Sequence, residues 1–236
     1  RVDMRLRPNG DSGPLVCSFD MLENYFYTQG REWERYAWIK ARPITGERWD
    51  ELEQIRGAFV FRKYLDFGAI DALRNLHAQI RRAVARKDRA DNVKLGPGGI
   101  REIEFIAQVF QLIRGGRDPA LQIKPTLEVL KRLVDRGQLE LGDVVALSAA
   151  YRFLRRLEHR LQYLDDAQTH ALPDNPDDRQ RVARAMGFAD YEALLMELDD
   201  HRQTVARHFA AVFAAPDEQN PALDQVWTGS GDGDQR

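Results

Sequence analysis

The chain has 236 residues, 43% hydrophobic and 31% charged, and its mean hydropathy is -0.53. This composition is that of a soluble globular protein and excludes collagen-like, wholly disordered and membrane-spanning chains. Because 35 Lys and Arg residues are balanced by 37 Asp and Glu residues, no overall basic excess exists to bind nucleic acid. The single cysteine, Cys17, excludes an internal disulfide and favours a reducing compartment. We therefore expect a cytoplasmic protein with neither nucleic acid nor a membrane as a partner.

The first seven residues alternate between apolar and charged side chains, as a half-buried strand does. The charged face carries Asp3, Arg5 and Arg7, and the turn-forming residues 8–14 predict a loop after the strand. A lone strand cannot form a stable sheet. We therefore expect its partner strands upstream, in a longer protein from which this chain is a fragment.

The rest of the chain is predicted to be helical. The first helix is capped by Ser18, with Gly30 as the left-handed residue that ends it, and a second helix runs from Trp33 to Lys40. Apolar residues at helical spacing predict further helices over 70–84, 100–114, 127–134, 143–168, 179–186 and 191–213. The fold class is therefore mainly α, a helical bundle that follows one strand.

Asp3 is the first candidate for chemistry. A carboxylate on a basic strand face, just before a glycine-containing loop, suits a metal-dependent phosphoryl or nucleotidyl transfer site, because carboxylates bind divalent cations and arginines neutralise phosphate. The alternative is a surface strand on which Asp3 pairs with Arg5 or Arg7. Spacing alone favours this second interpretation.

The segment from Lys94 to Gly99 contains three glycines and a proline and precedes a predicted helix. Glycines at a helix N-terminus allow backbone N–H groups to approach a phosphate closely, so Lys94, Gly98 and Gly99 are candidate phosphate ligands. The segment matches neither the Walker spacing nor the dinucleotide fingerprint. A hinge between two helices is the alternative.

The helix over 100–114 is apolar around most of its circumference and is expected to be central and buried. Glu102 lies on its apolar face and therefore needs a cationic or hydrogen-bonding partner. Its polar face is predicted to carry Arg101, Glu104, Gln108 and Gln111.

The long helix over 143–168 has a basic stripe that comprises Arg152, Arg156, His159 and Tyr163. The stripe is interpreted as a solvated basic face. The histidines of the chain show no metal-ligand spacing with one another, and no Ser/His/Asp arrangement is evident.

Three segments resemble, in the same order, the family of bifunctional glutamine synthetase adenylyltransferase/adenylyl-removing enzymes. The first is Arg-Val-Asp-Met-Arg-Leu-Arg-Pro with the Asp-Ser-Gly-Pro loop, over 1–15. The second is Lys-Leu-Gly-Pro-Gly-Gly-Ile-Arg-Glu-Ile-Glu-Phe and its continuation, over 94–117. The third, over 154–173, ends in Gln-Thr-His-Ala-Leu-Pro. The resemblance extends from Arg1 to about Phe213.

The resemblance implies the N-terminal, adenylyl-removing half of that family, to which the Asp-Ser-Gly-Pro loop and the Arg-Glu-Ile-Glu helix are more similar. The implied activity is Mg²⁺-dependent phosphorolysis of adenylyl-tyrosine on glutamine synthetase, which gives ADP. Inorganic phosphate, ATP and the PII signal protein are the further implied partners.

Asp3 then matches the third metal carboxylate of a polymerase-β-like nucleotidyltransferase site. The nucleotide or phosphate is expected to contact Arg5, Arg7, Lys94, Gly98 and Gly99. Arg101, Glu102 and Glu104 are expected to support these residues without contacting the nucleotide themselves. The Gly-Ser loop and Asp-x-Asp pair of such sites do not precede Asp3 in this sequence, so the chain by itself is expected to be inactive.

The resemblance implies three regions: residues 1–45 as the C-terminal remnant of the nucleotidyltransferase domain, 46–215 as a helical domain that packs on it, and 216–236 as a disordered linker. The alternative from another class is a non-catalytic helical module that binds glutamine synthetase or PII protein. A PII uridylyltransferase is a weaker alternative, against which the segment Gln168–Pro173 argues.

Overall fold

The computed structural model describes residues 7–63, 91–164, 166 and 168–213. The chain divides into two compact units, one of residues 1–73 with 111–124 and the other of 74–110 with 125–236. The predicted strand lies outside the described residues except for Arg7, and so do the predicted helix over 70–84 and the predicted linker from 216. The predicted regions 1–45, 46–215 and 216–236 therefore stay a prediction.

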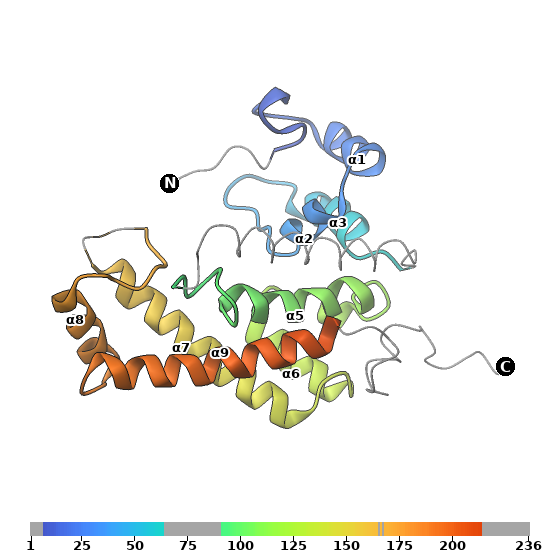
Figure 1. Cartoon of the computed structure of the whole chain (residues 1–236). Helices are drawn as coiled ribbons and strands as arrows, with labels where there is room; N and C mark the ends of the chain where they lie inside the picture. The colour runs from blue at the N-terminus through green and yellow to red at the C-terminus, as the bar shows by residue number, and fades with distance from the viewer. Residues whose placement is uncertain (1–6, 64–90, 165, 167, 214–236) are drawn as a thin grey trace. The chain divides into compact units, whose positions relative to one another are not determined.

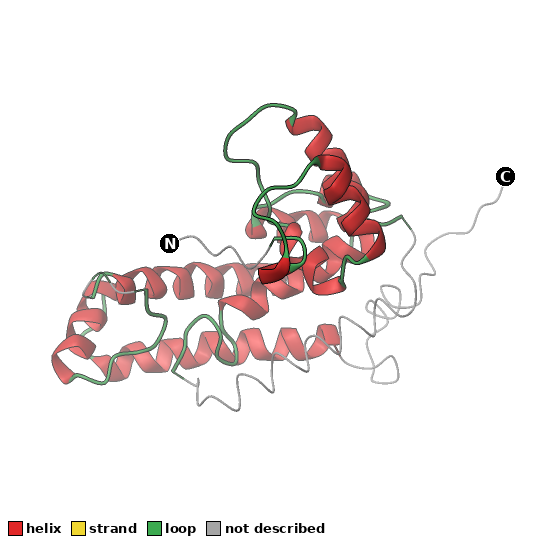
Figure 2. Ribbon diagram, turned by 90° about the horizontal axis from the view of Figure 1, so that it is seen from above, coloured by secondary structure: helices red, strands yellow, loops and turns green. Residues whose placement is uncertain are grey.

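Helices make up most of the described part, which confirms the mainly α fold (Figures 1 and 2). They are α1 (Phe19–Thr28), α2 (Glu32–Trp38), α3 (Trp49–Val60), α5 (Ile100–Arg114), α6 (Thr126–Asp135), α7 (Leu141–Gln162), α8 (Pro176–Met186) and α9 (Tyr191–Phe213). Short 3-10 turns lie at Gly10–Ser12 and Pro119–Leu121. Helix α3 was not predicted from the sequence.

The two ends of α1 show where local rules hold and where packing overrides them. The hydroxyl of Ser18 accepts a hydrogen bond from the N–H of Met21, which confirms the predicted N-cap. The prediction for Gly30 was wrong, because it is not among the residues with positive φ. A Cβ at Gly30 would lie 2.5 Å from the ring of Phe59 and 2.7 Å from the carbonyl oxygen of Phe26. The glycine serves close packing rather than a left-handed turn.

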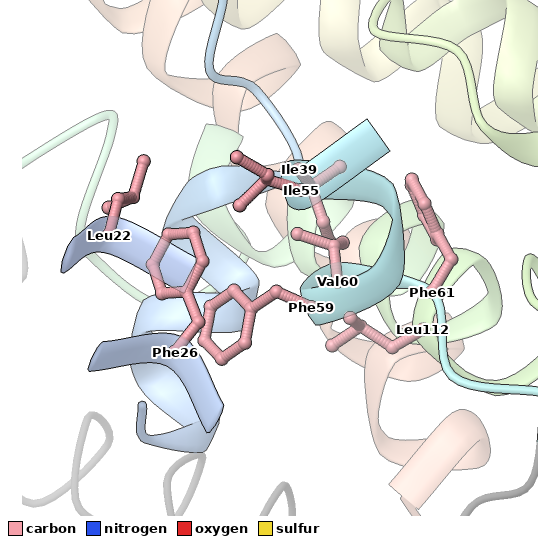
Figure 3. Packing of buried hydrophobic residues seen from close by; sticks show 8 residues of the cluster. All are labelled: Leu22, Phe26, Ile39, Ile55, Phe59, Val60, Phe61 and Leu112. Carbon is pink, nitrogen blue, oxygen red and sulfur yellow. The ribbon is translucent and has the colours of Figure 1, made fainter. Parts of the chain in front are cut away.

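The core of the first unit is an aromatic and aliphatic cluster (Figure 3). The rings of Phe26 in α1 and Phe59 in α3 stack with centroids 4.0 Å apart and an interplanar angle of 2°. Trp38 meets Phe26 edge-on at 5.1 Å. Offset stacking and edge contacts of this kind add to the stabilisation from burial alone.

Arg35 in α2 is completely buried beside this core. Its Nε donates to the carbonyl oxygen of Phe59 at 3.1 Å and its Nη2 to that of Val60 at 2.9 Å. Its Nη1 pairs with Glu32 at 2.6 Å. The last carbonyls of a helix have no partner within the helix, so Arg35 caps the end of α3 and joins it to α2.

The second unit is built around α7 and α9, which lie side by side, with α8 at the end where α7 leads into α9 (Figure 1). Residues 100–110 of α5 also belong to this unit, and the ring of Phe105 meets that of Phe209 in α9 edge-on at 6.0 Å. The predicted burial of α5 is confirmed for its apolar residues except Ile113, which is half-buried. Within the described residues, no helix is long and apolar enough to span a membrane.

The polar face predicted for α5 was only partly correct. Gln108 is 4% exposed and Gln111 is completely buried. The side-chain amide of Gln111 donates to the carbonyl oxygens of Leu121 and Ile123, each at 2.6 Å. These bonds fix the segment after α5, which explains why a polar side chain is buried there.

We expect Arg35→Met to destabilise the first unit by about 3 kcal/mol, because it leaves two buried carbonyl oxygens and Glu32 without their partner. Thermal and urea unfolding, followed by circular dichroism, measure the loss. Arg42→Met removes an exposed arginine and is the matched control, with little change expected. Equal unfolding midpoints for the two variants would contradict the capping role of Arg35.

Candidate functional site

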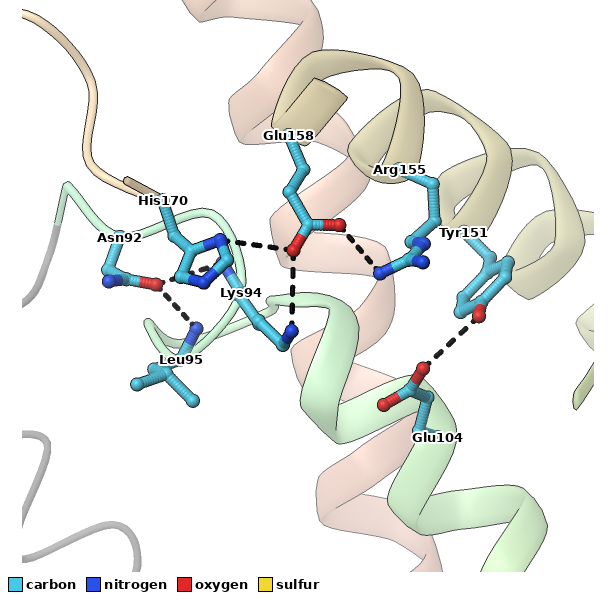
Figure 4. Close-up of polar contacts among 8 residues, drawn as sticks. All are labelled: Asn92, Lys94, Leu95, Glu104, Tyr151, Arg155, Glu158 and His170. Atoms are coloured by element: carbon cyan, nitrogen blue, oxygen red, sulfur yellow. Dashed lines mark hydrogen bonds and ion pairs between the residues drawn. The ribbon is translucent and has the colours of Figure 1, made fainter. Parts of the chain in front are cut away.

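The centre of the candidate site is Glu158, a carboxylate of α7 that is only 2% exposed (Figure 4). Its Oε2 accepts from Nη1 of Arg155 at 2.6 Å. Its Oε1 lies 3.4 Å from Nζ of Lys94 and 3.0 Å from Nδ1 of His170. A buried carboxylate is costly unless it is paired, and the two cations Lys94 and Arg155 compensate the charge.

Lys94 and His170 are brought to Glu158 by two loops that bond to each other. The N–H of Val93 donates to the carbonyl oxygen of His170 at 2.8 Å, and the N–H of Leu172 donates to that of Asp91 at 3.1 Å. Asn92 and Ala171 form an isolated antiparallel bridge. These backbone bonds hold Lys94 and His170 on the two sides of one loop pair beside Glu158.

The side chain of Asn92 shapes the first of these loops. Its Oδ1 accepts from the backbone N–H of Lys94 at 3.0 Å and from that of Leu95 at 2.8 Å (Figure 4). Asn favours such turns because its side chain can bond its own backbone two residues on. The turn directs Lys94 toward Glu158.

His170 is the group of the site that responds to pH. Burial and the neighbouring cations Lys94 and Arg155 lower its pKa from the usual value of about 6.5, and they outweigh the opposite effect of Glu158. Its Nδ1 is close to Glu158 but makes no aligned hydrogen bond. The neutral imidazole leaves one carboxylate beside two cations.

The backbone N–H groups of the glycine loop before α5 form hydrogen bonds within the loop and the first turn of the helix. The N–H of Gly99 donates to Gly96, and those of Arg101 and Glu102 donate to the carbonyl oxygens of Lys94 and Gly99 at 3.1 Å each. The carboxylate of Glu102 accepts from the N–H of Gly98 at 3.0 Å, so this acid has the partner that its position requires. Donors that are bonded inside the loop favour the structural interpretation of these glycines over a phosphate cradle.

Gly98 also permits a close approach to α9. Its φ is +67°, a conformation that residues with a side chain rarely adopt. A Cβ there would overlap the carbonyl oxygen of Arg202 and lie 2.5 Å from its Cα. The loop and α9 can therefore pack only with glycine at this position.

The remaining predicted site residues do not all lie in one described unit. Asp3 and Arg5 lie outside the described residues. Arg7 belongs to the first unit, and its Nε donates to the carbonyl oxygen of Gly13 at 3.1 Å, which fixes the loop after the predicted strand. Glu104 accepts from the hydroxyl of Tyr151 at 3.1 Å, and Arg101 is half-buried in the first turn of α5. The second unit thus holds Lys94, Gly98, Gly99, Arg101, Glu102 and Glu104.

Sequence reasoning missed Glu158 and His170. Glu158 shares a helix face with Leu154 and Leu161, so a carboxylate on an apolar face was the available signal. The described residues contain no group of three His, Cys, Asp or Glu side chains that could hold a metal ion. They do not by themselves supply the predicted magnesium site.

Two family profiles match parts of the chain. Residues 74–213 match the profile described as GlnD PII-uridylyltransferase, and residues 1–56 match that described as glutamate-ammonia ligase adenylyltransferase. Uridylyl and adenylyl groups are both nucleotidyl groups, so the two descriptions define one class, the nucleotidyltransferases. The helical part is thus similar to the uridylyltransferase profile, although the segment Gln168–Pro173 was expected to argue against that enzyme.

Curated relatives match along the whole chain under one description, bifunctional glutamine synthetase adenylyltransferase/adenylyl-removing enzyme. The relative from Aromatoleum aromaticum is 68% identical over 100% of this chain and 25% of its own length. Those from Chromobacterium violaceum and Nitrosomonas europaea are each 61% identical, over 96% and 91% of this chain and 26% and 24% of their own lengths. The chain belongs to this family, and it spans about a quarter of the length of these relatives.

We expect Gly98→Ala to destabilise the protein by about 2 kcal/mol or more, because the methyl group meets the backbone of α9 and the residue must keep a positive φ. Gly142→Ala is the matched control, since nothing lies within 4 Å of its Cβ position. It should leave stability unchanged or raise it by up to about 1 kcal/mol, because Ala reduces the entropy of the unfolded chain. Similar melting temperatures for the two variants would contradict the close approach of Gly98.

The depressed pKa of His170 gives the pH dependence a definite sign. The folded state disfavours the protonated imidazole, so its contribution to stability is complete above about pH 6.5 and is lost as the pH falls below that value. His170→Asn should therefore reduce the fall in melting temperature between neutral and mildly acidic pH. His208 has a pKa lowered by burial, and adding His208→Asn should reduce the fall further. An unchanged pH profile in the single variant would be evidence against a buried neutral His170.

Proposed function

We propose that this chain is part of the adenylyl-removing half of an enzyme that controls glutamine synthetase by removing and adding AMP on a tyrosine. In the removal reaction, an oxygen of inorganic phosphate attacks the phosphorus of adenylyl-tyrosine. The bond from phosphorus to the tyrosine oxygen breaks, the tyrosine oxygen takes a proton, and ADP leaves. The cytoplasm is the proposed location, and PII protein and ATP are further proposed partners.

One observation carries this proposal: the relatives described as adenylyltransferase/adenylyl-removing enzymes match 91–100% of the chain at 61–68% identity. The assignment to the adenylyl-removing half rests on the resemblance of the Asp-Ser-Gly-Pro loop and of the helix that contains Glu102 and Glu104. The proposed Mg²⁺ would be held by Asp3 together with carboxylates that the described residues do not provide.

In the proposed enzyme, the pairing of Lys94 with Glu158 orients a proposed phosphate contact and holds the loop before α5. Lys94 is held by Glu158 at 3.4 Å, so its ammonium group is oriented by a buried carboxylate. The same pairing fixes the loop that precedes α5. Lys94 remains 35% exposed, so a phosphate group could still approach it. Arg5 and Arg7 are the other proposed phosphate contacts.

The test is Asp3→Asn in the full-length protein that carries this chain. The change keeps the size of the side chain and removes its charge, so metal-dependent phosphorolysis should be abolished. Labelled inorganic phosphate is followed into ADP, in parallel with transfer of labelled AMP from ATP to glutamine synthetase. We expect adenylylation to remain largely intact and helical circular dichroism to be unchanged.

Asp50→Asn is the matched control, because Asp50 is an exposed acid in the first turn of α3. It should keep both activities. Loss of adenylylation with intact phosphorolysis in Asp3→Asn would place the chain in the opposite half. Retention of both activities would overturn the role of Asp3.

A further inference from the structure

The outer side of α7 carries a hollow lined mainly by cations, which we call the basic hollow. Its volume is about 520 Å³. It is lined by Leu127, Tyr151, Arg152, Arg155, Arg156, His159, Arg160 and Tyr163. It lies within the second unit, on the side of α7 turned away from Leu154 and Leu157.

The charge of the basic hollow is not compensated within the described part of the chain. Arg155 pairs with Glu158, whereas no described carboxylate forms an ion pair with Arg152, Arg156 or Arg160. The guanidinium carbon of Arg160 lies 5.8 Å from the ring centroid of Tyr163. Its Nε is buried and has no hydrogen-bond partner among the described residues. Neighbouring like charges repel one another, so the hollow is suited to an anionic occupant.

The shape of this surface favours a protein segment over a small anion as its occupant. The hollow lies along the middle and end of a helix, where backbone N–H groups are used within the helix and cannot cradle a phosphate. The same face of α7 continues toward its N-terminus through exposed apolar side chains, Val145 at 61% and Leu141 at 65%. The residues Leu141, Val145, Ala149, Arg152, Arg156 and Tyr163 follow one another at spacings that keep them on one face.

This face is about 33 Å long, at 1.5 Å per residue over the length of α7. It is apolar in its first half and basic in its second half. Tyr163 is 75% exposed at its end, and Tyr and Arg are the residue types enriched at the energetic centres of protein interfaces. A small anion would use only the basic half.

We propose that this face of α7 binds an acidic protein segment that places carboxylates in the basic hollow and apolar side chains on Val145 and Leu141. Arginine forks suit carboxylates because each can form two parallel hydrogen bonds. The proposal goes beyond the proposed enzymatic function and does not depend on which half of the enzyme the chain belongs to.

The experiment uses the full-length protein and a fluorescein-labelled peptide of five Glu-Glu-Leu-Ala repeats, with binding followed by fluorescence anisotropy. The double variant Arg152→Glu/Arg156→Glu should raise the Kd about tenfold or more, because it reverses two charges that face the peptide. Arg184→Glu/Arg207→Glu makes the same change in net charge at exposed positions on α8 and α9 and should raise it less than about twofold. Val145→Ser tests the apolar half and should also weaken binding.

Several results would overturn the proposal. They are failure of the unmodified protein to bind the peptide, equal weakening by the two double variants, and unchanged binding by Val145→Ser. Displacement of the peptide by millimolar inorganic phosphate or ATP would indicate a site for small anions instead. Tighter binding of a labelled RNA oligonucleotide, lost in the same double variant, would indicate a nucleic-acid surface. Circular dichroism of each variant confirms that a weaker affinity is not a loss of folding.

Discussion

The pairing of Glu158 is the interaction on which the arrangement of the second unit depends. A carboxylate with 2% exposure has almost no contact with water, so its charge must be compensated by protein groups. The two cations come from the loop before α5 and from α7 itself, and the neutral imidazole of His170 lies beside them. The charge of Glu158 is compensated when the loop before α5 is in place. One ionic centre therefore joins parts of the chain that are more than sixty residues apart.

The glycine loop before α5 shows how one sequence pattern serves two different physical purposes. Glycines before a helix are typical of phosphate sites because they allow N–H groups to point at an anion. Here the N–H of Gly98 is taken by Glu102, and the absence of a side chain is needed because the backbone of Arg202 lies against it. Close packing and anion binding require the same residue type. Only the partners of the N–H groups distinguish the two.

Helix α7 separates its charges between two sides. Glu158 lies on the inner side among leucines and is compensated there, whereas Arg152 and Arg156 are exposed on the outer side without a carboxylate partner in the described part of the chain. The inner carboxylate of Glu158 pairs with Lys94 and Arg155 and so holds the loop before α5 against α7. The outer charges are the basis of the proposed contact with an acidic protein segment.

Periodicity in the sequence was sufficient to predict the helices that have a continuous apolar stripe. The predicted bounds 100–114 and 191–213 agree with α5 and α9, and the cap at Ser18 was correct. Helix α3 was missed because its buried residues Ile55 and Phe59 are interspersed with charged ones, including Arg56, which is itself 5% exposed. The conformation of Gly30, the residue after the C-cap of α1, was predicted wrongly because its role depends on the ring of Phe59, which is distant in sequence.

The candidate site was predictable only in part for the same reason. The sequence by itself determined the helical class, the family resemblance, the position of Lys94 just before a buried helix and that of Glu102 in its first turn. Hydrogen bonds and apolar stripes of a helix involve residues three or four apart, so local sequence contains that information. The tertiary structure alone decided that Lys94 pairs with Glu158, that His170 joins them and that Gln111 is buried. Those pairings are decided by which distant groups share a desolvated space, a condition that no local pattern specifies.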